Sequence, residues 1–220
     1  SIVFISLSTI ETHVFNFIPL KLSVVLSVYF WAYYININNF IDGIDGFEIS
    51  NVIFCCIAVI ITTMIMNINI LEKYISIGIL SVSLPFLYFN KPSAKIFMGD
   101  SGSIFFGYII GWMVLRLISI DLWYIALIIT IYPILDVTLT IINKMRIGHK
   151  PWERLFDYYF LQGVKNKKIS HSKTLIFFNI HNIFCMILIF GCFYYPPIYM
   201  TILSIMSGLI LIYKFNTYKT

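Results

Sequence analysis

The sequence predicts an all-α fold, a polytopic bundle of membrane-spanning helices. Of its 220 residues, 60% are hydrophobic and only 11% are charged, and the mean hydropathy is +0.89. The apolar runs approach the ~20 residues that a helix needs to cross a bilayer. They are continuous rather than alternating, which favours helices over the strands of an outer-membrane barrel. This composition excludes a water-soluble domain.

Seven apolar runs follow one another along the chain, and each is bounded by residues that begin or end a helix. The first run, 21–38, ends in an Asn-rich stretch, and the second, 48–66, begins after two Asp-Gly pairs. The third, 73–89, lies between two lysines, and the fourth, 103–119, follows Gly-Asp-Ser-Gly. Glycines and polar residues at these boundaries are typical of helix ends.

The last three runs are 122–143, 174–193 and 197–214, with a proline pair at 196 and 197 as the hinge between the final two. Residues 1–9 are apolar but too short to span, so we expect a remnant of a helix there. The sequence has no initiator Met and no basic leader with a small-residue cleavage site. We therefore expect 1–220 to be a single integral membrane domain, about seven complete spans plus this remnant, forming the C-terminal portion of a longer protein.

The lysines and arginines predict how the bundle is oriented. If the loop after the first run faces the cytoplasm, strict alternation leaves only Lys21, Lys73 and Arg116 on the outside. The other basic residues then face the cytoplasm, as the positive-inside rule requires. The same alternation collects three polar clusters, 36–48, 90–103 and 144–173, on that face. The net charge of +5 reflects this sidedness, and we expect no nucleic-acid partner.

The first polar cluster contains NINNFIDGIDGF, with an amide or a carboxylate at every third position: Asn36, Asn39, Asp42 and Asp45. Oxygen donors of this kind, without basic partners in the same segment, are the ligands that Mg²⁺ prefers. The two glycines favour a helix end and allow close approach of the backbone to a ligand. The alternative is a polar connector that only caps two helices. Because ionisable groups beside a membrane are costly, the pattern favours a functional site.

The second cluster is KIFMGDSGS, in which Asp100 and Ser101 directly precede the run at 103–119. Free N–H groups and the positive end of that helix dipole would face the cytoplasm, which favours an anion site. Lys95 adds a charge suited to a pyrophosphate. Asp100 by itself could equally be an N-cap, since Asp and Ser are common there.

These clusters, in this order, resemble those of the polyprenyl-phosphate N-acetylhexosamine-1-phosphate transferases, the glycosyltransferase 4 group related to phospho-N-acetylmuramoyl-pentapeptide transferase. The matching pieces are NINNFIDGIDGF, IFMGDSGSIFFGYIIG and, more weakly, YPILDVTLTIINKMRIGHKPW, so the similarity covers about residues 22–175. The resemblance implies that a membrane polyprenyl phosphate attacks the β-phosphate of a UDP-N-acetylhexosamine and releases UMP. It also implies a bacterial plasma-membrane protein in cell-envelope glycan synthesis, with its site on the cytoplasmic face.

The resemblance also implies roles for individual residues. Asn39 and Asp100 would be Mg²⁺ ligands, and Asp42 and Asp45 would be the catalytic residues that bind or orient the phosphates and nucleotide. The remaining predicted substrate-binding residues are Asn36, Lys95, Ser101 and His171. The oligomeric state is left open, with a homodimer as one arrangement.

Two features depart from the family pattern. The chain contains no Asp-Asp pair, which fits a missing upstream loop, and no His-x-His-His motif. Tyr158 and Tyr159 lie near where the histidines are expected. Asp136, late in the run at 122–143, is expected near the cytoplasmic interface, in a structural role or one that supports the site.

Three classes of function remain at this point: a sugar-phosphate transferase, a transporter, and an inactive remnant of such an enzyme. A transporter favours polar residues near the bilayer midplane within paired repeats, whereas these polar clusters gather at one face. A CDP-alcohol phosphotransferase would need an Asp-Gly-x-x-Ala-Arg start, and DGIDGF lacks the Ala-Arg. The transferase is therefore the favoured prediction.

Overall fold

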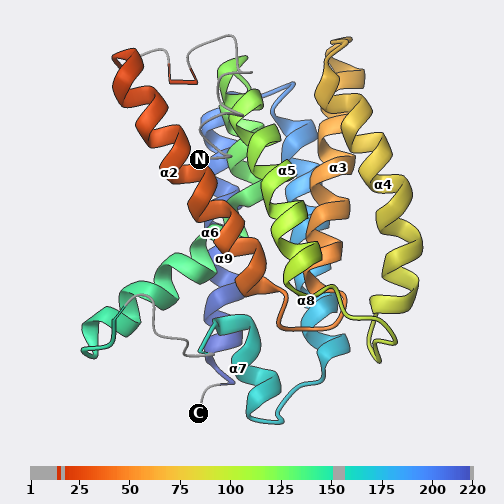
Figure 1. The fold of residues 1–220 in the computed structure, drawn as a ribbon, viewed down its shortest axis with the longest axis vertical. Coiled ribbons are helices and arrows are strands. Elements are labelled where there is room, and N and C mark those ends of the chain that lie inside the picture. Colours follow the sequence, from red (N-terminus) through yellow and green to blue (C-terminus); the bar gives the residue numbers. More distant parts are fainter. Residues whose placement is uncertain (1–13, 16–17, 151–156, 219–220) are drawn as a thin grey trace.

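The computed structural model describes residues 14, 15, 18–150 and 157–218. In this part of the chain all regular secondary structure is helical (Figure 1). The all-α prediction is confirmed, and the remnant predicted at 1–9 lies outside the described residues. The helices are α2 (Leu20–Ile41), α3 (Phe47–Ile65), α4 (Leu71–Asn90), α5 (Gly99–Ser119), α6 (Trp123–Arg146), α7 (Tyr159–Lys165), α8 (His171–Gly191) and α9 (Pro197–Asn216).

All seven predicted runs are helices, but they differ in how well they suit a membrane. Six of them, α2, α3, α5, α6, α8 and α9, are long and apolar enough to cross a bilayer. The seventh, α4, has 20 residues but is less hydrophobic, because serines, Pro85 and the charged pair Glu72 and Lys73 interrupt its sequence. It nevertheless runs beside α3 along the bundle (Figure 1), so it covers α3 as a spanning helix would.

The start of α5 and the presence of α7 are two differences from the sequence prediction. Helix α5 begins at Gly99 rather than at 103, so Asp100 lies inside its first turn, and the N-cap is Met98. The alternative that Asp100 is the N-cap is therefore wrong. Gly99 has a φ of +63°, which lets the chain turn directly into the helix. Helix α7 was not predicted, because seven residues are too few to show an apolar period. The hinge at Pro196 and Pro197 is confirmed, with Pro197 as the first residue of α9.

Helices α2 and α5 approach each other closely where α5 carries glycine. A Cβ built on Gly107 would lie 2.9 Å from Asn38 Cβ and 3.1 Å from Ile35 Cα. One turn further along α5, a Cβ on Gly111 would lie 2.7 Å from Trp31 Cδ1. The Trp31 indole N–H donates to the Tyr108 carbonyl over 2.8 Å. Small residues thus set the separation of the two helices that carry the polar motifs.

A substitution at Gly107 is expected to be costly. Gly107→Ala should destabilise the protein by about 1–3 kcal/mol, because its methyl group would push against the α2 backbone. Gly78→Ala is the matched control in α4, where a Cβ meets nothing within 4 Å. That change should be neutral or stabilise by up to about 1 kcal/mol. Thermal unfolding of both variants in detergent measures the difference, and equal stability would contradict the close packing of α2 on α5.

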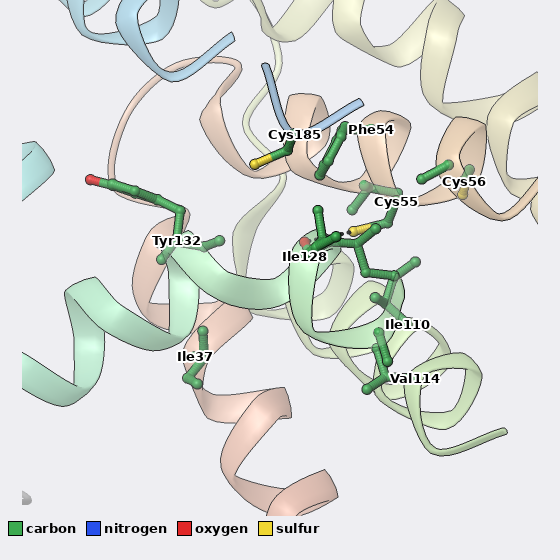
Figure 2. Close-up of a cluster of buried hydrophobic side chains, with 14 of the residues drawn as sticks. Ile37, Phe54, Cys55, Cys56, Ile110, Val114, Ile128, Tyr132 and Cys185 are labelled. Atoms are coloured by element: carbon green, nitrogen blue, oxygen red, sulfur yellow. Dashed lines mark hydrogen bonds between the residues drawn. The ribbon is translucent and has the colours of Figure 1, made fainter. Parts of the chain in front are cut away.

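The buried core joins the helices in the body of the bundle. Figure 2 shows Ile37 of α2, Cys55 and Cys56 of α3, and Ile110 of α5 among its members. The cysteines at 55, 56, 185 and 192 are all buried and unbridged, as expected for thiols in apolar helices. Closer to the polar end, the Phe47 ring stacks on Phe178 at 4.0 Å and on Phe160 at 4.8 Å. The start of α3 is therefore fixed to α7 and α8 by aromatic contacts.

The polar clusters gather at one end of the bundle. Helix α2 ends there and α3 begins there. The α4–α5 connection, α7, the start of α8 and the end of α9 lie at the same end, at the bottom of Figure 1. The predicted convergence of the three clusters is confirmed for the described residues.

Candidate functional site

The end of α2 and the start of α5 meet through a side-chain amide. Asn39 Nδ2 donates to Asp100 Oδ1 over 3.0 Å and to Ser103 Oγ over 3.0 Å. The Ser103 hydroxyl in turn donates to the Gly99 carbonyl over 3.1 Å. The close approach of α2 and α5 brings these residues together, although 61 positions separate Asn39 from Asp100.

Asp42 lies at the C-terminal end of α2, beside the same group. Burial raises the pKa of its carboxyl to about 6, the Gly99 N–H that donates to it acts in the opposite direction, and the nearby Asp100 carboxylate raises it further. Two carboxylates therefore share this corner, and the charge of Asp100 disfavours the ionised form of Asp42. A cation placed between them would relieve that repulsion and favour ionised Asp42.

Asp45 belongs to a second group on the other side of the loop. Its Oδ2 accepts from the Ala94 N–H over 3.2 Å, and its Oδ1 lies 3.5 Å from His171 Nδ1 at the start of α8. The next N–H, of Gly46, donates to Asn90 Oδ1 over 3.1 Å, and Asn90 Nδ2 donates to the Ile96 carbonyl over 2.9 Å. The Asp-Gly loop, the α4–α5 connection and α8 are thus held together.

Three predicted site residues stand apart from these groups. Asn36 is exposed, and its amide donates to the carbonyl of Ala32 on its own helix over 2.7 Å. Ser101 is exposed as well, and Asn39 pairs with Ser103 instead. Lys95 is exposed, while the contact of its loop with Asp45 comes from the Ala94 backbone. Their binding roles stay predictions.

Sequence reasoning missed two residues that hold the site together, Asn90 and Ser103. Asn90 looked like the polar end of a helix, and Ser103 like an ordinary helix-start residue. The signal that could have found Ser103 is its place at i+3 from Asp100, which puts both on one face of α5. Asn90 offered no comparable signal, since its partners belong to distant loops.

The oxygen-bearing side chains at this end of the bundle suit an Mg²⁺ ion that takes only some of its ligands from the protein. Within the described residues, no group of three or more His, Cys, Asp and Glu side chains could hold a metal ion. A cage built from these four side-chain types is therefore absent from that part of the chain. Mg²⁺ does not require one, because it is commonly held by one or two carboxylates with water and phosphate oxygens. Exposed Asp100 provides one such carboxylate, and the Asn39 amide lies beside it.

Asp136 has the structural role expected of it. Its Oδ1 accepts from the Tyr159 N–H over 3.0 Å, and its Oδ2 accepts from the Phe160 N–H over 3.1 Å and from the Tyr132 hydroxyl over 2.7 Å. The carboxylate thus caps the start of α7 and ties it to α6. Tyr158 beside it is buried and stacks on Phe40 at 5.7 Å, so these tyrosines build the core in the region where the histidine motif was expected.

A bundle of apolar helices with acidic and amide side chains gathered at one end defines a multi-pass membrane protein with a site at its surface. The chain belongs to glycosyl transferase family 4, whose family model matches residues 1–118, more than half of the 220 residues. The resemblance found in the sequence motifs is confirmed.

Relatives of this chain are curated membrane transferases. A probable undecaprenyl-phosphate N-acetylglucosaminyl 1-phosphate transferase of Bacillus subtilis is 34% identical over 116 residues, 50% of this chain and 32% of the relative. The phospho-N-acetylmuramoyl-pentapeptide-transferase of Clostridium beijerinckii is 32% identical over 160 residues, 68% of this chain and 47% of the relative. That of Leuconostoc citreum is 34% identical over 91 residues, 40% and 28% respectively. The chain spans less than half the length of these relatives.

Proposed function

We propose that the complete protein transfers an N-acetylhexosamine 1-phosphate from a UDP-sugar to a membrane polyprenyl phosphate and releases UMP, for cell-envelope glycan synthesis. The observation that carries this proposal is the meeting of Asn39, Asp42 and Asp100 at one end of a bundle of membrane helices. Family membership and the names of the bacterial relatives support it. A transporter is disfavoured because the polar groups lie at one end rather than at the centre of the helices.

The chemistry requires anions to be brought together. A phosphate nucleophile and a diphosphate repel each other, so the site must offset their charge and hold them in line. Bound Mg²⁺ would supply that positive charge, with Asp100 and Asn39 as its proposed protein ligands. The N–H groups of Asp100 and Ser101, in the first turn of α5, precede the first hydrogen bond of the helix and suit phosphate oxygens. The nucleophile is already ionised at neutral pH, so no general base is needed.

The Asp45 group is proposed to hold the nucleotide side of the donor. The Ala94 N–H donates to the Asp45 carboxylate and holds it in place. His171, at the start of α8, lies beside the same carboxylate. A histidine at this place can donate to a phosphate or uracil oxygen. Lys91 and Lys95, in the α4–α5 connection with Ala94, add positive charge at this end of the bundle. Asp42 lies beside Gly99 and Asp100 and is proposed to orient the phosphates.

The proposal places the protein in a bacterial plasma membrane with the site facing the cytoplasm. The distribution of basic residues supports that orientation, since the end of the bundle that carries the site also carries most of the lysines and arginines. UDP-sugars would then reach the site from the cytosol and polyprenyl phosphate from the inner leaflet.

One experiment tests both the reaction and the orientation. The full-length protein is placed in inside-out and in right-side-out membrane vesicles, and UDP-N-acetylhexosamines are added outside with Mg²⁺ and polyprenyl phosphate in the membrane. UMP should be released by the inside-out vesicles alone. Release by intact right-side-out vesicles would reverse the orientation, and a lack of release from both, after detergent permeabilisation as well, would reject the transfer activity for the sugars tested.

A further inference from the structure

Four polar side chains are buried together near the Asp-Gly loop. Tyr34 and Asn38 lie one turn apart on α2, and Glu48 and Asn51 lie one turn apart at the start of α3. Glu48 and Asn38 are 0% exposed and Asn51 is 1% exposed. Nothing in the proposed transfer reaction uses them.

These side chains converge. The Tyr34 hydroxyl lies next to the side chains of Asn38 and Asn51 without reaching hydrogen-bond geometry to either, and it is within electrostatic range of Glu48. Glu48 is in turn within electrostatic range of Asp42, at the edge of the site. The group thus lies near Asp42, with two of its members on α2 and two on α3.

The polar atoms of this group lack partners. Both Glu48 oxygens, both polar atoms of the Asn51 amide, the Asn38 oxygen and the Tyr34 hydroxyl are buried without a hydrogen bond. Asn38 Nδ2 is already engaged, since it donates to the Tyr34 carbonyl over 2.9 Å. A single unpaired buried polar atom is unfavourable, and buried polar groups in proteins are nearly always paired. Several of them in one place therefore point to a ligand.

The ligand should carry positive charge. Among the described residues no Lys, Arg or His forms an ion pair with Glu48, and the charged group that acts on it, Asp42, has the same sign. A carboxylate removed from water needs a proton or a cation. A proton would give a hydrogen-bond donor to one oxygen, whereas a cation can contact four or five at once. The abundance of acceptors favours the cation.

We propose that Tyr34, Asn38, Glu48 and Asn51 form a binding site for a monovalent cation, with Na⁺ as the probe. One carboxylate with neutral amide and hydroxyl oxygens is a hard donor set. The single negative charge of Glu48 balances one positive charge, whereas a divalent ion would leave one positive charge buried without a counter-charge. A bound cation would fix the start of α3 against α2 and offset the negative charge near Asp42.

The test uses the full-length protein in detergent without Mg²⁺. Thermal unfolding is followed as NaCl replaces choline chloride at constant ionic strength. The midpoint of wild type should rise saturably, by about 5–10 °C at a 100-fold excess over the dissociation constant. Glu48→Gln keeps the shape of the side chain and removes its charge, so the Na⁺ response should be lost. Asn51→Ala removes one ligand and should raise the half-saturating Na⁺ concentration at least tenfold.

Glu72→Gln is the matched control. Glu72 is also a buried glutamate in the first turn of a helix, but its Oε1 accepts from Arg116 Nε over 2.6 Å at the opposite end of the bundle. This variant should lose stability and keep the Na⁺ response. A wild-type midpoint that does not respond to Na⁺, or a response that survives in Glu48→Gln, would overturn the cation site. The readout is stability, so it is independent of whether the protein transfers sugar phosphates.

Discussion

Asp100→Asn in the full-length protein is expected to lower the rate of UMP release at least about 100-fold, a typical loss when one charge-stabilising group is removed from an active site. Asp100 is exposed at the start of α5, where Asn39 donates to it over 3.0 Å. An amide in its place retains a hydrogen-bonding oxygen but loses the negative charge that would hold Mg²⁺. The measurement is the initial rate of UMP release across a Mg²⁺ titration.

The same variant should fold normally, because residue 100 is exposed and Asn keeps the side-chain oxygen that accepts from Asn39. Asp121→Asn is the control: this residue lies in the turn between α5 and α6, at the other end of the bundle, with a φ of +62° that Asn adopts readily. It should leave both rate and stability unchanged. If Asp100→Asn turned over at nearly the wild-type rate, the proposed metal-binding role of Asp100 would be wrong.

Asp136→Asn is expected to destabilise the region around α7 by about 1–3 kcal/mol. The carboxylate accepts from two backbone N–H groups and from the Tyr132 hydroxyl in a fully buried position. An Asn has one acceptor oxygen, and its NH₂ group would face a donor, so at least one buried N–H loses its partner at a cost of about 1–3 kcal/mol. Hydrogen exchange of the amides in Tyr159–Lys165 should accelerate more than that of α3 or α6.

Thr140→Val provides the comparison. Thr140 contacts the same carboxylate only through a long hydrogen bond of 3.5 Å, so its loss should change stability by about 0.5 kcal/mol or less and leave α7 protected. Unchanged protection of α7 in Asp136→Asn would show that aromatic packing, such as that of Phe160 on Phe47, is sufficient to hold this helix. The structural role assigned to the carboxylate would then be rejected.

The site could be predicted from the sequence only in part. The spacing of NINNFIDGIDGF and the family resemblance identified Asp42, Asp45, Asn39 and Asp100, and the structure places these residues in two neighbouring groups. Asn36 was included because it shares the three-residue spacing, yet it pairs with its own helix. Spacing along a helix gives the face of a residue only approximately, and a small rotation of α2 decides whether that face meets α5 or water.

Glu48 is the residue for which the sequence was least informative. A charged side chain at the start of an apolar run is expected at the membrane surface, in contact with water. The structure buries it completely between α2 and α3. Its position follows from Gly46, whose φ of +76° turns the chain back so that the first turn of α3 faces α2. The direction in which the chain turns at Gly46 could not be predicted from the composition of the segment.

The sequence by itself determined that the protein is embedded in a lipid bilayer, and hence its fold class. Long apolar runs must bury their backbone polar groups in helices, and this requirement depends only on local composition. The lysines and arginines likewise predicted which end of the bundle carries the polar loops. The tertiary structure alone decided which polar groups meet, because contacts such as Asn39 with Asp100 depend on how closely two helices pack and how each is rotated. Gly107 and Gly111 permit that approach for α2 and α5. No local sequence pattern shows which helix will pack against these glycines.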